Sequence, residues 1–191
     1  MGCRQRSMRW RGGSAAMAVA CIGLVSCGGG GGDDPAEGEE SASTTVALES
    51  TTTTLSVTQE VEAAFLAFNA MMDRLREAPD PDDTEIAQRA SGETLLGIID
   101  AATTMQTTGF SARFGERDSV DVLSVTLVDP ATAIVRDCQV EDLTEVNAEG
   151  ETNGPFVCTF WTEWTLIKVD DAWLVDSGKG VERREGEHPC E

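Results

Sequence analysis

The spacing of the apolar residues changes near Phe110, and this change constrains the fold more than any other feature of the chain. Upstream, apolar residues recur at steps of four, three and four: Val61, Phe65, Phe68 and Met72. This is the period of a helix that buries one face. Downstream, apolar and polar residues alternate, which is typical of strands with one buried face. Helices followed by an antiparallel series of strands predict an α+β domain.

The helical part is expected to form one long helix over residues 57–78, which Pro79 ends, and a second helical segment over residues 84–107. Gly92 and Gly97 lie inside the second segment. Glycine weakens a helix interior by roughly 1 kcal/mol relative to alanine. The two glycines are therefore expected to split or bend this segment.

Turn signals divide the rest of the chain into strands. Asp129-Pro130, an acidic stretch over residues 147–152 and Asp170-Asp171 separate the alternating runs. The strands are expected over residues 122–127, 131–140, 156–169 and from 172 onward, with a bulge or bend at Gly178 and Gly180.

The first 26 residues have the composition of a secretory signal. Four arginines precede a 12-residue apolar stretch over residues 14–25, which is shorter than the roughly 20 residues that span a bilayer. The sequence Leu24-Val25-Ser26-Cys27 closes the stretch and resembles the lipobox of bacterial lipoproteins. The resemblance implies cleavage before Cys27 and a lipid on its sulfur. Such a lipid would anchor the protein at the extracytoplasmic face of the cell membrane.

Three segments are therefore expected: a signal peptide over residues 1–26, a lipid-anchored tether over residues 27–56, and one domain over residues 57–191. Glycine, acidic residues and threonine dominate the tether, and they bury too little apolar surface to offset the entropy of ordering the chain. The 135 residues of the domain are enough for one hydrophobic core.

The charge excludes one class of partner. Removal of the signal segment leaves 10 basic residues against 34 acidic ones, a net charge of about −24. Such a surface repels the phosphates of nucleic acids and the headgroups of anionic lipids. We expect no nucleic-acid partner, and a membrane contact only through the lipid on Cys27.

The order of the elements and several local sequences resemble the nuclear transport factor 2-like, or SnoaL-like, family, and within it the actinobacterial Mce-associated-type lipoproteins. The matching sequences are residues 135–138 (VRDC), 149–150 (EG), 160–164 (FWTEW) and 168–175 (KVDDAWLV), with a cysteine near the C-terminus. The resemblance implies a cone-like fold, in which N-terminal helices pack on a curved antiparallel sheet.

Three cysteines remain in the domain after the signal is removed and Cys27 is lipidated: Cys138, Cys158 and Cys190. A hairpin symmetric about residues 148–149 would place Cys138 opposite Cys158, within reach of a disulfide. The rival pairing, Cys138 with Cys190, is favoured because Cys158 shares a face with apolar residues and Cys190 would otherwise be an exposed thiol. The family resemblance also implies the rival pairing.

Groups for catalysis are scarce. The chain has a single histidine, His188, in a polar tail and no tyrosine, so the Asp-Tyr-Asp arrangement of ketosteroid isomerase cannot be built. Asp80, Asp82 and Asp83 lack the glycine and the acidic residue that a calcium loop needs at its sixth and twelfth positions. We expect no catalytic residue, no metal site and no cofactor.

Several side chains nevertheless have positions from which they could face the interior of the cone. The carboxylates are Asp73, Asp100, Asp121, Asp137 and Glu163, and the aromatic residues are Trp161, Trp164 and Trp173. The carboxylates are expected to lie mainly on the solvent face, and the tryptophans to pack in the core or on the sheet.

The function expected from these features is a non-enzymatic domain that binds a protein partner or a small apolar ligand. The alternative is a SnoaL-like or isomerase-like enzyme with a carboxylate base in the cone. A cavity of several hundred Å³ around a buried carboxylate would favour the enzyme. A filled cone with exposed apolar surface would favour binding.

Replacing Cys27 with alanine should release the protein from the membrane, because the residue that carries the lipid is lost. The domain should stay folded, since Cys27 lies outside it. Fractionation of cells that produce each form tests this. An exported Cys27→Ala protein that stays in the membrane fraction would contradict the lipid anchor.

Overall fold

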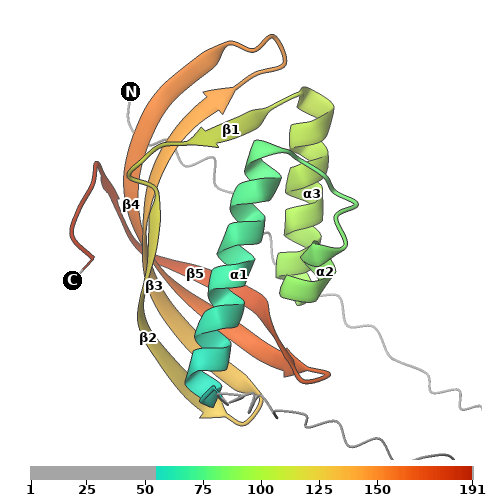
Figure 1. Ribbon diagram of the computed structural model, residues 1–191, viewed down its shortest axis with the longest axis vertical. Helices are drawn as coiled ribbons and strands as arrows, with labels where there is room; N and C mark the ends of the chain where they lie inside the picture. The colour runs from blue at the N-terminus through green and yellow to red at the C-terminus, as the bar shows by residue number, and fades with distance from the viewer. Residues whose placement is uncertain (1–54, 191) are drawn as a thin grey trace, which may run out of the picture. The chain divides into compact units, whose positions relative to one another are not determined.

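Three helices lie against the concave side of one strongly curved antiparallel sheet (Figure 1). The structure is a computed structural model and describes residues 55–190. The helices are α1 (Val57–Glu77), α2 (Glu85–Arg89) and α3 (Gly92–Thr108), and the strands are β1 (Ser111–Phe114), β2 (Ser119–Asp129), β3 (Thr132–Val146), β4 (Thr152–Val169) and β5 (Ala172–Glu185). This is the α+β, cone-like architecture that the sequence predicts.

The predicted signal segment, Cys27 and the tether up to residue 54 lie outside the described residues. Within residues 55–190, no helix is long and apolar enough to cross a membrane.

Helix α1 begins at a capping box. Ser56 Oγ accepts a hydrogen bond from the backbone N–H of Gln59 (3.4 Å), and the Ser56 N–H donates to Gln59 Oε1 (2.9 Å). These bonds satisfy backbone and side-chain groups at the open end of the helix.

The second helical segment breaks at Ala90 and Ser91, and Gly97 lies within α3 without interrupting it. Ala90 is extended and forms an isolated bridge with Val175, and the Ser91 N–H donates to Val175 O at 2.9 Å. The prediction of a split is confirmed at Gly92, which has a φ of +54°. Gly97 was wrongly expected to contribute, because a helix tolerates one glycine when tertiary packing supports it.

The sheet is built around β3 and β4. The strand order is β1-β3-β4-β5, and β2 pairs with the N-terminal part of β3 while β1 pairs with its C-terminal part. Strand β1 was not predicted, and β3 continues six residues beyond the expected end at Val140. These two differences have one cause: β1 pairs antiparallel with the end of β3 that was not predicted, Ser111–Phe114 with Leu143–Val146.

The hairpin of β3 and β4 does not have the register that would place Cys138 opposite Cys158. Cys138 lies opposite Trp161, and Cys158 lies opposite Glu141. The turn centres on Glu149, and an irregularity between Leu143 and Glu145 shifts the register of the rest of the hairpin. Because side chains alternate between faces, this register places Cys138 and Cys158 on opposite sides of the sheet.

The core lies between α1 and the concave face of the sheet. The Trp164 ring contacts Phe65 and Phe68 at centroid distances of 6.0 and 5.5 Å. On β5, Gly178 leaves room for the same ring, since a Cβ at this position would collide with the Trp164 side chain. The predicted irregularity of β5 is confirmed, but it lies beside the two glycines: the register shifts at Asp176 and at Val181, whereas Gly178 and Gly180 are themselves paired with β4.

The C-terminal tail crosses the other face of the sheet and is fixed there by covalent and hydrogen bonds. Cys138 and Cys190 form a disulfide with a Cα–Cα distance of 5.6 Å. Thr159 Oγ1 donates to Gly186 O (2.9 Å) and accepts from the His188 N–H (2.9 Å). His188 is therefore held against the sheet, not in a freely solvated tail.

Replacing Cys138 and Cys190 together with alanine should lower the free energy of unfolding by about 4 kcal/mol, because the disulfide closes a loop of 52 residues. Urea denaturation should show a lower midpoint for the variant, and the wild type measured with a thiol reductant should shift in the same direction. An unchanged midpoint would contradict a structural role for the bridge.

Candidate functional site

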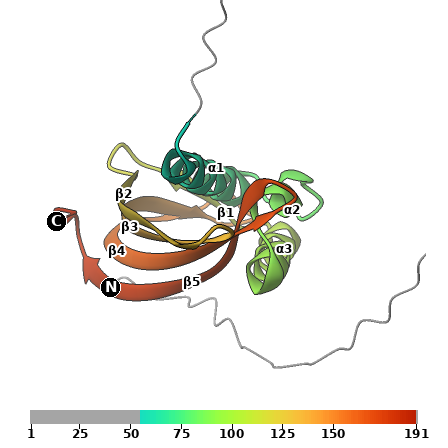
Figure 2. The same ribbon diagram turned by 90° about the horizontal axis from the view of Figure 1, so that it is seen from below.

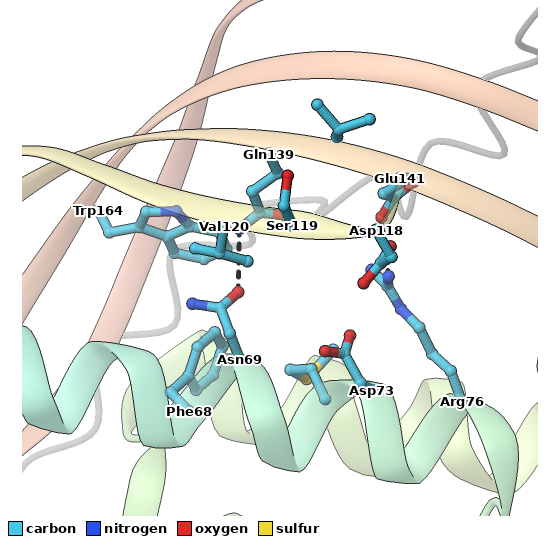
Figure 3. Close-up of a pocket in the computed structure, with 12 residues that line it drawn as sticks. Phe68, Asn69, Asp73, Arg76, Asp118, Ser119, Val120, Gln139, Glu141 and Trp164 are labelled. Carbon is cyan, nitrogen blue, oxygen red and sulfur yellow. Dashed lines mark hydrogen bonds and ion pairs between the residues drawn. The ribbon is translucent and has the colours of Figure 1, made fainter. Parts of the chain in front are cut away.

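A small cavity with polar and apolar lining lies between α1 and the sheet (Figure 3). Its volume is about 60 Å³, which is room for a few water molecules. Sites for drug-sized ligands measure roughly 300–1,000 Å³. Residues of α1, β3, β4 and the segment that opens β2 line it: Phe68, Asn69, Met72, Asp73, Arg76, Asp118, Ser119, Val120, Gln139, Val140, Glu141 and Trp164.

Asp137 lies beside this cavity and is almost completely buried, with 1% of its surface exposed. The indole N–H of Trp164 donates to its Oδ1 (3.1 Å), and Gln139 Nε2 donates to its Oδ2 (2.6 Å). Gln139 Nε2 also donates to Asn69 Oδ1 (2.9 Å), and Asn69 Nδ2 donates to the Phe65 carbonyl (3.0 Å). Both carboxylate oxygens of Asp137 are therefore occupied by donors from within the protein.

Burial raises the pKa of Asp137 to about 6, although the hydrogen bonds from Gln139 and Trp164 act in the opposite direction. A carboxylic acid with this pKa is a candidate general base near neutral pH. Its position argues against that role, because a base must reach the proton it abstracts.

A second group of charges lines one end of the cavity. Arg76 on α1 forms an ion pair with Glu141 on β3, with 2.7 Å between Nη1 and Oε1. Figure 3 shows Asp73 directed into the cavity from α1, with Asp118 on its opposite side. Asp118 Oδ1 accepts a long hydrogen bond of 3.4 Å from the Asp142 N–H.

This end of the cavity holds more acid than one arginine neutralises. Burial, and then the negative charge of Asp73, raises the pKa of Asp118 to about 6. Burial also raises the pKa of Asp73, and the nearby Arg76 lowers it in part. Asp118 and Asp73 are better placed for proton transfer than Asp137, because both are only half-buried and line the cavity.

The structure separates the carboxylates that the sequence groups together. Asp73 and Asp137 lie at or beside the cavity. Asp100 and Asp121 are exposed, and Glu163 pairs with Arg136 on the other face of the sheet (3.1 Å). The expectation that these groups mainly face solvent is therefore wrong for Asp137, which is buried, and for Asp73, which is directed into the cavity.

The remaining candidates have structural partners. Trp164 and Trp173 belong to the core, while the Arg184 guanidinium lies 5.0 Å above the Trp161 ring. In the loop after α1, Asp83 pairs with Arg74 at 3.4 Å. Residues 55–190 contain no cluster of three or more metal-ligating side chains.

Sequence reasoning missed Asn69, Arg76, Asp118 and Gln139. Two of them carried a usable signal. Asn69 follows Phe68 and lies four residues after Phe65, on the buried side of α1. Gln139 lies two residues after Asp137, so it shares the same face of β3. Arg76 and Asp118 gave no such signal, because their proximity depends on how α1 crosses the sheet.

No protein-family model matches the chain, and no curated protein sequence is similar to it. Among solved structures, the intermembrane space region of chloroplast protein ARC6 is similar with a TM-score of 0.55 and 17% identity, over 67% of this chain and 98% of that one. This likeness shows a shared fold and nothing about activity.

Two further likenesses have lower scores. One is to a ketosteroid isomerase-like protein from Erwinia carotovora atroseptica, with a TM-score of 0.44 and 17% identity over 65% of this chain and 96% of that one. The other is to an NTF2-like protein with a cystatin-like fold from Novosphingobium aromaticivorans, with a TM-score of 0.38 and 14% identity over 64% and 81% of the two chains. Neither score is high enough to carry an argument about this chain.

Replacing Asp137 with asparagine should flatten the dependence of stability on pH. The pKa of Asp137 is about 6 in the folded protein against an ordinary value of 3.8, so its ionisation opposes folding. Its contribution lowers the free energy of unfolding as pH rises from about 4 to 6, by about 3 kcal/mol in total.

Urea denaturation at several pH values between 4 and 7 measures this contribution as the difference between the wild type and Asp137→Asn. The matched control is Asp100→Asn, which removes an exposed carboxylate of α3. Parallel pH curves for wild type and Asp137→Asn would show that Asp137 titrates as it does in the unfolded chain.

Proposed function

We propose that this protein is a lipid-anchored extracytoplasmic module whose domain binds a protein partner without catalysing a reaction. The observation that carries the proposal is the filled interior. The cavity of about 60 Å³ is too small for an organic substrate, and both oxygens of the buried Asp137 beside it accept hydrogen bonds from within the protein.

The anchoring part of the proposal rests on the sequence. The lipobox-like residues 24–27 end a signal-like segment, and a tether of about 28 residues separates Cys27 from Leu55. A flexible tether of this length has an r.m.s. span of roughly 30 Å. Such a spacer would hold an acidic domain away from anionic headgroups and leave its surface free for a partner.

Binding of a small apolar ligand inside the cone has less support than binding of a protein. The cavity is lined by Asn69, Asp73, Arg76, Asp118 and Glu141 among others. An apolar ligand would have to displace the water of these groups without replacing its hydrogen bonds, which costs free energy. We therefore place the binding function on the outer surface of the domain.

An enzyme of the isomerase or SnoaL-like kind is the second candidate. The observation in its favour is Asp118, which lines the cavity and has a pKa raised to about 6. Proton transfer by this residue would require the cavity to enlarge when substrate binds. Displacement of the Phe68 or Trp164 side chain would be needed, and these rings pack against each other at 5.5 Å.

A neutral apolar dye such as Nile red should not bind saturably to the wild-type domain. Replacing Phe68 with alanine removes a buried ring next to Trp164 and should open an apolar space beside the cavity. The space left by one phenyl ring suits benzene and not the larger dye, so we expect the Phe68→Ala variant to bind benzene in a calorimetric titration while the wild type does not.

Leu96→Ala is the matched control, because Leu96 is 68% exposed on α3 and its truncation opens no interior space. Thermal denaturation of all three proteins confirms that the titrations report on folded domains. Saturable binding of the dye to the wild type, weakened by Asp118→Asn, would overturn the proposal in favour of a ligand-binding or catalytic interior.

A further inference from the structure

Strand β2 forms an open edge of the sheet. Within residues 55–190 its only strand partner is β3, so the backbone groups on its other side have no strand to bond. Figure 2 shows β2 at the side of the sheet, away from α2, α3 and β5. None of its residues is buried, and three large apolar side chains are strongly exposed: Leu123 (42%), Leu127 (42%) and Val128 (58%).

An open edge of this composition is unusual for a folded protein. Edge strands are normally protected against pairing by charges, glycine, proline or short length. Strand β2 has 11 residues, and its central seven, Val122–Val128, include no charged residue, glycine or proline. Uncharged segments of this length with β-branched residues favour strand pairing.

The opposite edge of the sheet shows the usual protection. In β5, the segment Ser177–Glu185 contains two glycines and five charged residues: Lys179, Glu182, Arg183, Arg184 and Glu185. The contrast matters in a chain with a net charge of −20. The uncharged part of β2 is a place where two such chains can approach with little repulsion.

The sequence of β2 reads nearly the same in both directions. Residues 121–129 are Asp-Val-Leu-Ser-Val-Thr-Leu-Val-Asp. An antiparallel pair of two β2 strands, with its two-fold axis at Val125, would place Val122 opposite Val128, Leu123 opposite Leu127 and Ser124 opposite Thr126. An isologous interface requires this kind of self-complementarity.

The backbone is suited to such pairing in the middle of the strand. Ser124–Leu127 pair regularly with Arg136–Ala133 of β3, while the ladder is irregular at Leu123 and at Val128. Ser124 and Thr126 are exposed and lie on the same face of the sheet, because they alternate with Val125. The proposed axis at Val125 maps the regular residues Ser124, Val125 and Thr126 onto one another, and Leu123 and Leu127 flank them.

From these observations, we infer that β2 is an interaction surface for a second copy of this chain. The two β2 edges pair antiparallel about Val125 and join two sheets into one. Two strands bury less area than the roughly 1,600 Å² of a standard interface, so the contact is weak and reversible. Asp121 of each copy faces Asp129 of the other, so the contact strengthens as salt screens this repulsion. The inference does not depend on the proposed function.

Cysteine cross-linking tests the register. The proposed pair places residue 124 of one copy opposite residue 126 of the other, within disulfide reach. Full-length chains carrying Ser124→Cys and Thr126→Cys, with tags of different size, should form a mixed disulfide when produced together in an oxidising compartment. Either variant produced alone should cross-link several-fold less, because the same residue in the two copies lies diagonally across the pair and not directly opposite. Lys179→Cys on β5 is the control for random collision.

The inference is overturned if the mixed pair cross-links no better than the Lys179→Cys control, or if each variant cross-links alone as well as the mixture. Non-reducing gel electrophoresis distinguishes these results. Retention of the wild-type melting temperature shows that each variant is folded.

A pair of double variants provides an independent measurement. In the variant with Ser124→Glu and Thr126→Lys, the glutamate of each copy faces the lysine of the other copy. This variant should dimerise at least as strongly as the wild type. Ser124→Glu with Thr126→Glu places like charges at the same positions and should weaken the dimer by about tenfold or more. Sedimentation equilibrium of the full chain in detergent measures both. Equal dimerisation of the two double variants would overturn the proposed register.

Discussion

The contact between Trp164 and α1 holds the two layers of the domain together. The indole ring packs against Phe65 and Phe68 on one side, and Gly178 leaves space for it on β5. Its N–H donates to Asp137, so the same side chain fixes the hydrophobic core and the buried polar network. A smaller residue in place of Trp164 would loosen the packing of α1 and remove a hydrogen-bond donor from the buried Asp137 carboxylate. Burial of that carboxylate is tolerated only because donors surround it.

This arrangement explains why a fold of this kind has almost no open interior here. Aromatic rings occupy the cone, and the Arg76–Glu141 ion pair, Asn69 and Gln139 line part of the small space that remains. The shared fold with the ARC6 region concerns architecture only. Because the interior is filled, the chemistry of the surface is the better guide to function. The two edges of the sheet differ in charge: the middle of β2 has no charged residue, whereas the end of β5 has five.

The periodicity of the sequence predicted the main elements because burial of one face determines where helices and strands occur. It did not predict the register of β3 and β4, which depends on one residue in the turn and one irregularity near Thr144. That shift reverses the face of Cys158 relative to Cys138. The near-symmetry of residues 121–129 is a property of the sequence, but their exposure at an edge of the sheet follows only from the strand order.

The α+β class, the buried stripe of α1 and the strand alternation could all be predicted from the amino-acid sequence, since each follows from local spacing. Which carboxylates lie close together depends on the three-dimensional packing. Asp73, Arg76, Asp118 and Glu141 come from three separate segments, and Asp137 acquires its raised pKa from burial. Local patterns report which side of an element is apolar, whereas burial and proximity depend on how α1 crosses the curved sheet.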